Sequence, residues 1–222
     1  TPLADNQQEL LKLAREAKRD PAQAVRIAEA ARDTQAKRVT DARSVVRRET
    51  ITEAAHGITL PAGAQIITGD FRDVMAEMQP DSVDLVFTDP PYDRETVPLY
   101  EDLAILSARV LRPGGSLLCY AGHYALPDLF ALMTPHLKFW WPIALFYSGA
   151  ARRLPGKFVF IEWKPVLWFV KESRAGERLV SDSFRCQQAP EKALHEWEQG
   201  QAEAEYYIDT ITEPGALVLD PF

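Results

Sequence analysis

The sequence predicts an α/β fold in which a mostly parallel sheet carries helices on both faces, ends in an antiparallel hairpin and follows a helical arm. Two observations support this prediction. From residue 64 onward, short apolar runs alternate with stretches of helical periodicity, which is the pattern of parallel strands joined by helices. Two β-rich runs then follow one another with no helix between them, which indicates an antiparallel pair. We therefore expect a helical N-terminal arm over residues 1–57 and one α/β domain over residues 58–222.

The arm is predicted from helix start signals and apolar spacing. Asp20 is an N-cap residue type, Pro21 suits the first helical position, and a shorter helix precedes them over about residues 7–18. Apolar residues then recur at helical spacing as far as Val46. The basic residues of the arm could touch phosphates. The alternative is a solvated face that packs on the α/β domain or on a second subunit, which would make the protein a homodimer.

The α/β domain is expected to begin after a linker at residues 59–63, and Gly114-Gly115 marks a break between a helix and the next strand. The last helix is amphipathic, so its apolar side should face the core. The tryptophans of the β-rich runs are expected to be core residues rather than stacking platforms. In chain order we expect strand 64–68, helix 71–78, strand 83–87, helix 98–111, strand 116–121, helix 125–134, β-rich runs 139–147 and 158–170, an irregular polar segment 172–190, and helix 191–212.

Composition is that of an ordinary globular protein. The 222 residues are 46% apolar and 26% charged, and no run approaches the roughly 18 apolar residues that span a membrane. There is no signal-peptide layout, and the two cysteines, Cys119 and Cys186, lack metal-ligand spacing. We therefore expect a cytoplasmic protein with reduced thiols and no metal site.

The charge distribution limits how nucleic acid could bind. The net charge is −7, and residues 1–50 carry 11 Lys/Arg against 8 Asp/Glu, which is +3, so the remaining residues carry −10. Any contact with nucleic acid must use local basic patches rather than the field of the whole protein.

The most informative segment is Asp89-Pro90-Pro91-Tyr92, at the C-terminal end of a predicted strand. In an open α/β sheet this is the edge where ligands bind. Asp89 and the Pro90 carbonyl could each accept one N–H of an exocyclic amine, while Tyr92 offers a face on which a base can stack. Two such acceptors draw the amine nitrogen towards sp3 geometry, which directs its lone pair at an electrophile.

The alternative is an ordinary Pro-Pro turn that closes a strand, with Asp89 as a turn residue. The functional interpretation requires that the Asp89 carboxylate is not buried in an ion pair and is not turned away from Phe222.

Four segments in consistent spacing resemble the S-adenosylmethionine-dependent amino-DNA methyltransferases, which modify N6 of adenine or N4 of cytosine. Their signature is Asp/Asn/Ser-Pro-Pro-Tyr/Phe/Trp, and the likeness covers about residues 64–222. It implies a Rossmann-like methyltransferase sheet in the permuted beta class, because the catalytic segment precedes the cofactor segment. The four segments are Ile67–Asp70, Asp89–Tyr92, Arg109–Ser116 and Pro214–Phe222.

The resemblance also implies cofactor-binding residues. Asp70 and Phe71 follow the strand end where the cofactor's adenine is held, and Asp220-Pro221-Phe222 opens the cofactor loop. His195 and Gln199, at i and i+4 of the last helix, would border the methionine end. In the family the loop continues into a Gly-rich run, so we expect the natural chain to extend beyond Phe222.

A candidate nucleic-acid contact lies between the two β-rich runs, where Arg152, Arg153 and Lys157 accompany glycine and proline. These cations could hold phosphates or clamp the target base; a solvated hairpin tip is the alternative. The segment 172–190 corresponds to the target-recognition insert and is very small, which predicts loose or short sequence recognition.

The sequence therefore predicts methylation of the amino group of a base in duplex DNA after base flipping, with S-adenosyl-L-methionine as donor, in a prokaryote or phage. Asp at position 89 favours N6-adenine over N4-cytosine. RNA base methylation and a non-catalytic nucleic-acid-binding module stay open as alternatives. The intact Asp89–Tyr92 segment argues against the second of these.

Overall fold

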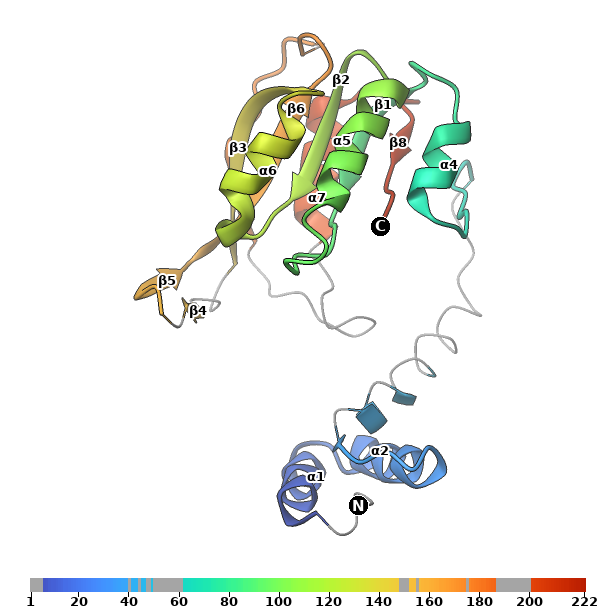
Figure 1. Cartoon of the computed structure of the whole chain (residues 1–222), viewed down its shortest axis with the longest axis vertical. Coiled ribbons are helices and arrows are strands. Elements are labelled where there is room, and N and C mark those ends of the chain that lie inside the picture. The colour runs from blue at the N-terminus through green and yellow to red at the C-terminus, as the bar shows by residue number, and fades with distance from the viewer. Residues whose placement is uncertain are drawn as a thin grey trace. The chain divides into compact units, whose positions relative to one another are not determined.

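The computed structural model describes residues 6–39, 41–43, 45–46, 49, 62–147, 152–154, 156–174, 176–186 and 201–222 (Figure 1). The chain divides into two compact units. The first comprises Thr1–Gln65 with Glu191–Glu198, and the second comprises Ile66–Pro190 with Gln199–Phe222.

The first unit is built on two helices, α1 (Gln7–Arg19) and α2 (Pro21–Asp33). The side chain of Asp20 accepts a hydrogen bond of 3.0 Å from the backbone N–H of Gln23, so the predicted N-cap is confirmed. The apolar stripe of α2 is buried within the unit, against residues that follow the helix. The buried members are Ile27, Ala30, Ala31, Val39, Ala42 and Val46.

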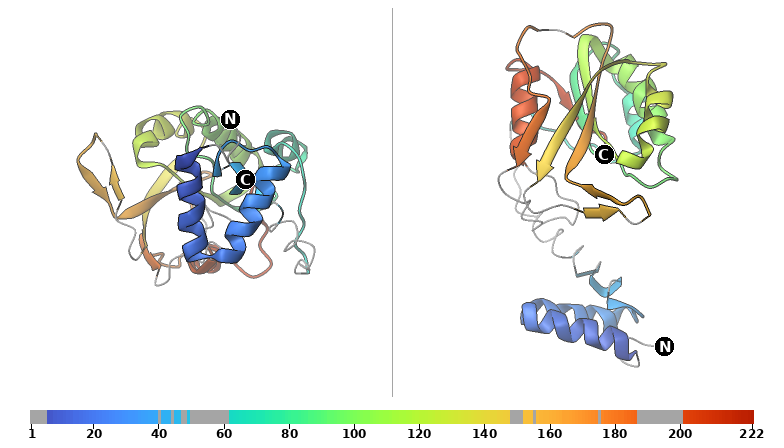
Figure 2. Two further views of the ribbon diagram at one scale, coloured as in Figure 1. Left: turned by 90° about the horizontal axis from the view of Figure 1, so that it is seen from below. Right: turned by 90° about the vertical axis from the view of Figure 1, so that its left-hand side faces the viewer.

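The second unit contains a six-stranded sheet of order β7-β3-β6-β2-β1-β8 (Figures 1 and 2). Only β6 runs antiparallel to its neighbours, β2 and β3; all other pairs of this sheet are parallel, so the predicted mostly parallel sheet with an antiparallel hairpin is confirmed. The strands are β1 (Val83–Thr88), β2 (Leu111–Tyr120), β3 (Lys138–Tyr147), β6 (Trp163–Val170), β7 (Ser183–Cys186) and β8 (Val218–Leu219).

Helices cover both faces of this sheet, because its central strands are apolar on both sides. Leu117 and Cys119 pack with the side chains of α4 (Phe71–Glu77), α5 (Leu99–Val110) and α6 (Leu126–Met133). The alternate residues, Leu118 and Tyr120, belong to the opposite core, which includes Tyr207 of α7 (Gln201–Ile211). A short 3₁₀ turn, η2 (His123–Ala125), leads into α6. Figure 2 shows α7 on one side of the sheet and α5 and α6 on the other.

One predicted strand is wrong. Residues 64–68 form no strand, and Ile66 and Ile67 are 74% and 57% exposed. Extended backbone becomes a strand only when another strand satisfies its N–H and C=O groups, and no described strand pairs with this segment. The apolar pattern was therefore present without the partner that it needs.

Two further elements differ from the prediction. β2 begins at Leu111 rather than residue 116, and Gly114 takes a φ of 85° inside it, which glycine adopts without strain. The segment expected to be irregular contains β7, which pairs in parallel with the C-terminal half of β3. No periodic signal marks β7, because an edge strand of four residues is defined by its neighbour.

Within the described part of the chain, no helix has both the length and the apolar character needed to cross a membrane. Cys119 and Cys186 are buried free thiols.

Candidate active site

The candidate site lies where two parallel strands end side by side. Val86 of β1 is in register with Leu219 of β8, so Thr88 and Asp220 emerge together. The hydroxyl of Thr88 donates a 2.6 Å hydrogen bond to Oδ1 of Asp220, and the same oxygen accepts from the backbone N–H of Phe222 at 3.3 Å. The predicted catalytic segment, which starts at Asp89, and the predicted cofactor loop therefore share one edge of the sheet.

Asp70 and Phe71 reach the same edge from α4. Asp70 caps the helix by accepting from the backbone N–H of Arg72 at 2.9 Å, and its carboxylate pairs with the Arg72 guanidinium at 2.6 Å. These hydrogen bonds lower the pKa of Asp70 to about 2. The ring centroids of Phe71 and Phe222 are 4.6 Å apart, so α4 touches the end of the chain. The predicted cofactor residues Asp70, Phe71, Asp220 and Phe222 are thus close neighbours.

Asp89 occupies a half-open position directly after β1. Its side chain is 26% exposed, and it accepts a hydrogen bond from the phenol of Tyr92. Pro90 is buried and Pro91 is exposed. Among the described residues, no donor binds the carbonyl oxygen of Pro90, so a ligand can use it. The two acceptors required by the sequence hypothesis are therefore available beside one aromatic ring.

A lysine that the sequence hypothesis missed stands beside Asp89. Nζ of Lys164, on β6, lies 3.4 Å and 3.5 Å from the two carboxylate oxygens of Asp89. Burial lowers the pKa of Lys164, while the negative charge of Asp89 acts in the opposite direction. The separations are long for a charge-assisted hydrogen bond. Asp89 is thus paired but not buried, which keeps the carboxylate accessible.

Lys164 had a sequence signal. It is a lone cation at the start of an apolar strand, and β-strands that are buried on both faces seldom carry a charge. That signal does not reveal which acid lies opposite, because Asp89 and Lys164 are 75 residues apart.

The three predicted nucleic-acid contacts lie on or beside a small hairpin. β4 (Arg152–Leu154) pairs in antiparallel fashion with β5 (Val159–Ile161), and Lys157 is exposed at the turn between them. The hairpin projects beyond the main sheet (Figures 1 and 2). Two aromatic rings next to Lys157 also face solvent: Phe158 is 86% exposed and Phe160 is 68% exposed.

Two predicted cofactor residues, His195 and Gln199, lie outside the described residues. The predicted apolar face of the last helix is confirmed for its described part, since Tyr207 is buried and Ile208 and Ile211 pack against the same core.

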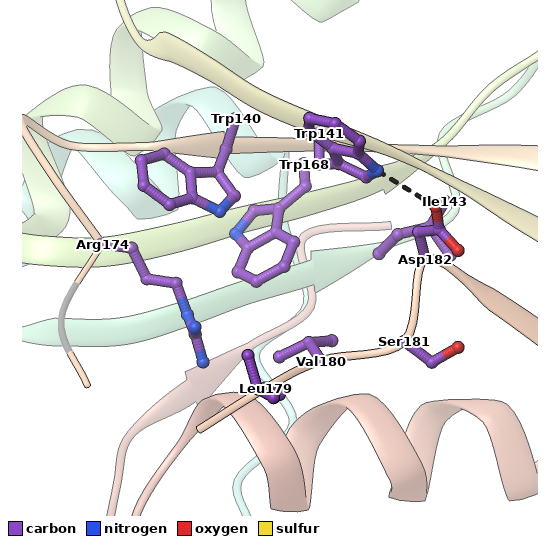
Figure 3. Close-up of a pocket in the computed structure, with 9 residues that line it drawn as sticks. All are labelled: Trp140, Trp141, Ile143, Trp168, Arg174, Leu179, Val180, Ser181 and Asp182. Carbon is purple, nitrogen blue, oxygen red and sulfur yellow. Dashed lines mark hydrogen bonds between the residues drawn. The ribbon is translucent and has the colours of Figure 1, made fainter. Parts of the chain in front are cut away.

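The prediction that the tryptophans are core residues holds for Trp168 but is wrong for Trp141, which is 53% exposed. An irregularity in the β3–β6 register between Phe139 and Trp141 inserts Trp140 as an extra residue. The three indoles border a cavity of about 430 Å³ on the α7 face, where the Arg174 guanidinium lies 5.2 Å from the Trp168 ring (Figure 3). Trp141 donates to Asp182 at 3.3 Å across its rim.

Comparison with solved structures identifies the fold. The chain matches PvuII DNA methyltransferase (cytosine-N4-specific) at 18% identity and a TM-score of 0.53, over 68% of this chain and 71% of that one. It matches the complex of M1.HpyAVI with SAM at 19% identity and a TM-score of 0.56, over 71% and 81%. TTHA0409 from Thermus thermophilus, named as a DNA modification methylase and complexed with S-adenosyl-L-methionine, matches at 20% identity and a TM-score of 0.55, over 70% and 77%.

At these identities the matches establish a shared architecture, the amino-DNA methyltransferase fold, over about 70% of the chain. No protein-family model matches the sequence, and no curated protein matches it.

Proposed function

Given a fold shared with amino-DNA methyltransferases, we propose that this chain transfers a methyl group from S-adenosyl-L-methionine to the exocyclic amino group of a base in DNA, most readily N6 of adenine. The observation that carries the proposal is the position of Asp89. Its half-exposed carboxylate follows β1, beside Tyr92 and next to the strand end that bears Asp220.

The residues at the sheet edge fit such a cofactor. The paired rings of Phe71 and Phe222 can border a planar adenine, and the carboxylate of Asp220 can accept hydrogen bonds from hydroxyl or amino groups. When bound, S-adenosyl-L-methionine supplies a methyl carbon made electrophilic by the adjacent sulfonium.

The protein's own groups would then prepare the amine. Asp89 accepts one N–H of the exocyclic amine and the Pro90 carbonyl accepts the other, which directs the nitrogen lone pair at the methyl carbon. A carbon–nitrogen bond forms as the carbon–sulfur bond breaks, and the product amine releases a proton to solvent. No proton must leave before attack, so positioning carries the catalysis; effective molarity can supply roughly 7–11 kcal/mol of a barrier.

The target base must leave the duplex to reach this position, which costs a few kcal/mol. Tyr92 can offset part of that cost by stacking. The charge of −10 on residues 51–222 favours a single-stranded substrate over a duplex, and this observation supports RNA base methylation as the second candidate. A cytoplasmic location is part of the proposal.

The proposal is tested by incubating the full-length protein with tritium-labelled S-adenosylmethionine and unmodified DNA, followed by nucleoside analysis. We expect label in N6-methyladenosine. Label in N4-methylcytosine would change the base, and label that appears only with RNA would change the substrate. A complete absence of transfer to any nucleic acid would contradict the proposed function.

The link between β1 and β8 gives a prediction for cofactor affinity. Thr88→Val keeps the side-chain shape but removes the hydrogen bond to Asp220. Hydrogen bonds to charged groups contribute about 1.5–3 kcal/mol, so we expect the dissociation constant for S-adenosylmethionine to rise at least tenfold. Calorimetric titration measures the change. Thr88→Ser retains the hydroxyl and should bind as the parent does; equal loss in both variants would exclude the hydrogen bond as the cause.

The hairpin gives a prediction for DNA affinity. We expect replacement of Arg152, Arg153 and Lys157 by alanine to weaken DNA binding for all sequences alike. Each phosphate contact that is lost should reduce the slope of log affinity against log salt by about 1. Fluorescence anisotropy at several salt concentrations measures the slope. Lys171→Ala, at the other end of β6, is the matched control. An unchanged slope in the triple variant would remove the hairpin from the DNA interface.

A further inference from the structure

Lys164 is the second residue of β6, at the end of the strand that lies beside the candidate site. Leu118, Tyr120, Val166 and Trp168 form the apolar core on the α7 face of the sheet. The alternation of side chains along β6 places Lys164 on that same face, where its side chain is only 20% exposed. An ammonium group in such a place needs compensating contacts, because burial of a charge is costly.

Three groups supply these contacts. Nζ lies 3.4 Å and 3.5 Å from the two oxygens of Asp89. It also lies 4.7 Å from the ring centroid of Tyr92 and 4.4 Å from that of Tyr120, within the range of cation–π attraction. Tyr120 is buried and cannot move freely, so it anchors the ammonium from below. Lys164 therefore connects a rigid strand to both polar members of the Asp89–Tyr92 segment.

The contacts select one role. The segment after β1 contains no regular secondary structure that would fix the Asp89 side chain, and the phenol of Tyr92 bonds locally to that same carboxylate. Lys164 is the described residue of another strand that contacts both side chains. A hydrogen-bond acceptor that is misplaced by about 1 Å can lose roughly a hundredfold in rate.

We propose that Lys164 is a positioning residue of the methyl-transfer site, which holds the Asp89 carboxylate and the Tyr92 ring in the arrangement that receives the target amine. The inference rests on the proposed function. It concerns a residue that touches the two base-binding groups and does not itself need to contact the base.

Other charged and titratable groups face the same space. Glu203 of α7 is buried and adds negative charge near Lys164; it accepts a 3.0 Å hydrogen bond from Tyr147 of β3 and contacts the thiol of Cys186 on β7. Burial raises the pKa of Tyr147 and of Cys186, so these two groups stay neutral as Lys164 titrates.

The proposal has a pH signature. Because burial lowers the pKa of Lys164, the ammonium loses its charge below the pH at which an ordinary lysine does, near about 10.4. As pH rises through the lowered pKa, the attraction between Lys164 and Asp89 disappears. We expect kcat/KM to fall on the alkaline side for the parent. In Lys164→Arg the guanidinium stays charged, so this alkaline fall should move out of the measured range.

The experiment compares Lys164→Met, Lys164→Arg and the matched control Lys171→Met, which removes a cation from the opposite end of β6, in the full-length protein. We expect Lys164→Met to lower kcat/KM at least tenfold, with cofactor affinity within about threefold of the parent. Lys164→Arg should recover most of the loss, and Lys171→Met should resemble the parent. Parent-like kinetics in Lys164→Met, or an unchanged alkaline limb in Lys164→Arg, would overturn the proposal.

A measurement without turnover separates this inference from the proposed function. In NMR spectra of protein labelled with ¹³C at lysine Cε, Lys164 should show a ring-current shift from its two tyrosines, and the shift should change in Asp89→Asn. A shifted signal in a protein that transfers no methyl group would contradict the function and leave the contact standing. An unshifted signal in an active protein would refute the positioning role alone.

Discussion

Asp89→Ala is expected to lower methyl transfer at least about a hundredfold, while the affinity for S-adenosylmethionine stays within a few-fold of the parent. Removal of one preorganised hydrogen-bonding group at a reacting centre typically has an effect of this size on kcat. The cofactor residues lie after β8 and on α4, and Asp220 is held by Thr88 rather than by Asp89, so the cofactor side should survive. Labelled methyl transfer and calorimetric titration measure the two quantities.

Two matched variants make this result specific. Asp93→Ala removes an exposed carboxylate four residues away and should behave as the parent does. Asp89→Asn keeps one carbonyl oxygen as an acceptor but loses the charge that faces Lys164, so it should retain part of the activity. Near-parental turnover by Asp89→Ala would remove Asp89 from its role.

Tyr92→Ala is expected to raise the KM for DNA by roughly 5- to 150-fold, with a smaller effect on the affinity for the cofactor. Stacking of a base on an aromatic side chain contributes roughly 1–3 kcal/mol, which is this range of fold-changes. Steady-state kinetics at saturating S-adenosylmethionine measure the change.

Tyr92→Phe separates the ring from the phenol. This variant keeps the stacking surface and the contact with Lys164, but it loses the hydrogen bond to Asp89. We expect it to bind DNA nearly as the parent does and to lose some of its kcat. If both variants raise the KM equally, the ring does not carry the base.

The local sequence determined the helices and the inner strands well, because their signals lie within a few residues. Asp20 and Pro21 start α2 as predicted, and the apolar run before Asp89 forms β1 as Val83–Thr88. Asp89, Pro90 and Tyr92 were found for the same reason: their residue types and the strand before them are contiguous in the chain.

Features that depend on a partner were missed or misplaced. Residues 64–68 have the composition of a strand but no described strand beside them, and Ser183–Cys186 became a strand because β3 is its neighbour. The exposure of Trp141 follows from an irregularity of register that no pattern in the sequence reveals.

By itself, the sequence determined that an acid, a free carbonyl and an aromatic ring follow one strand, because adjacency along the chain fixes these groups at a single turn. Only the tertiary structure decided that Lys164 would face that acid and that Asp220 would lie beside it. The physical reason is that strand order and register, rather than local propensity, bring together side chains that are 75 and 131 residues from Asp89.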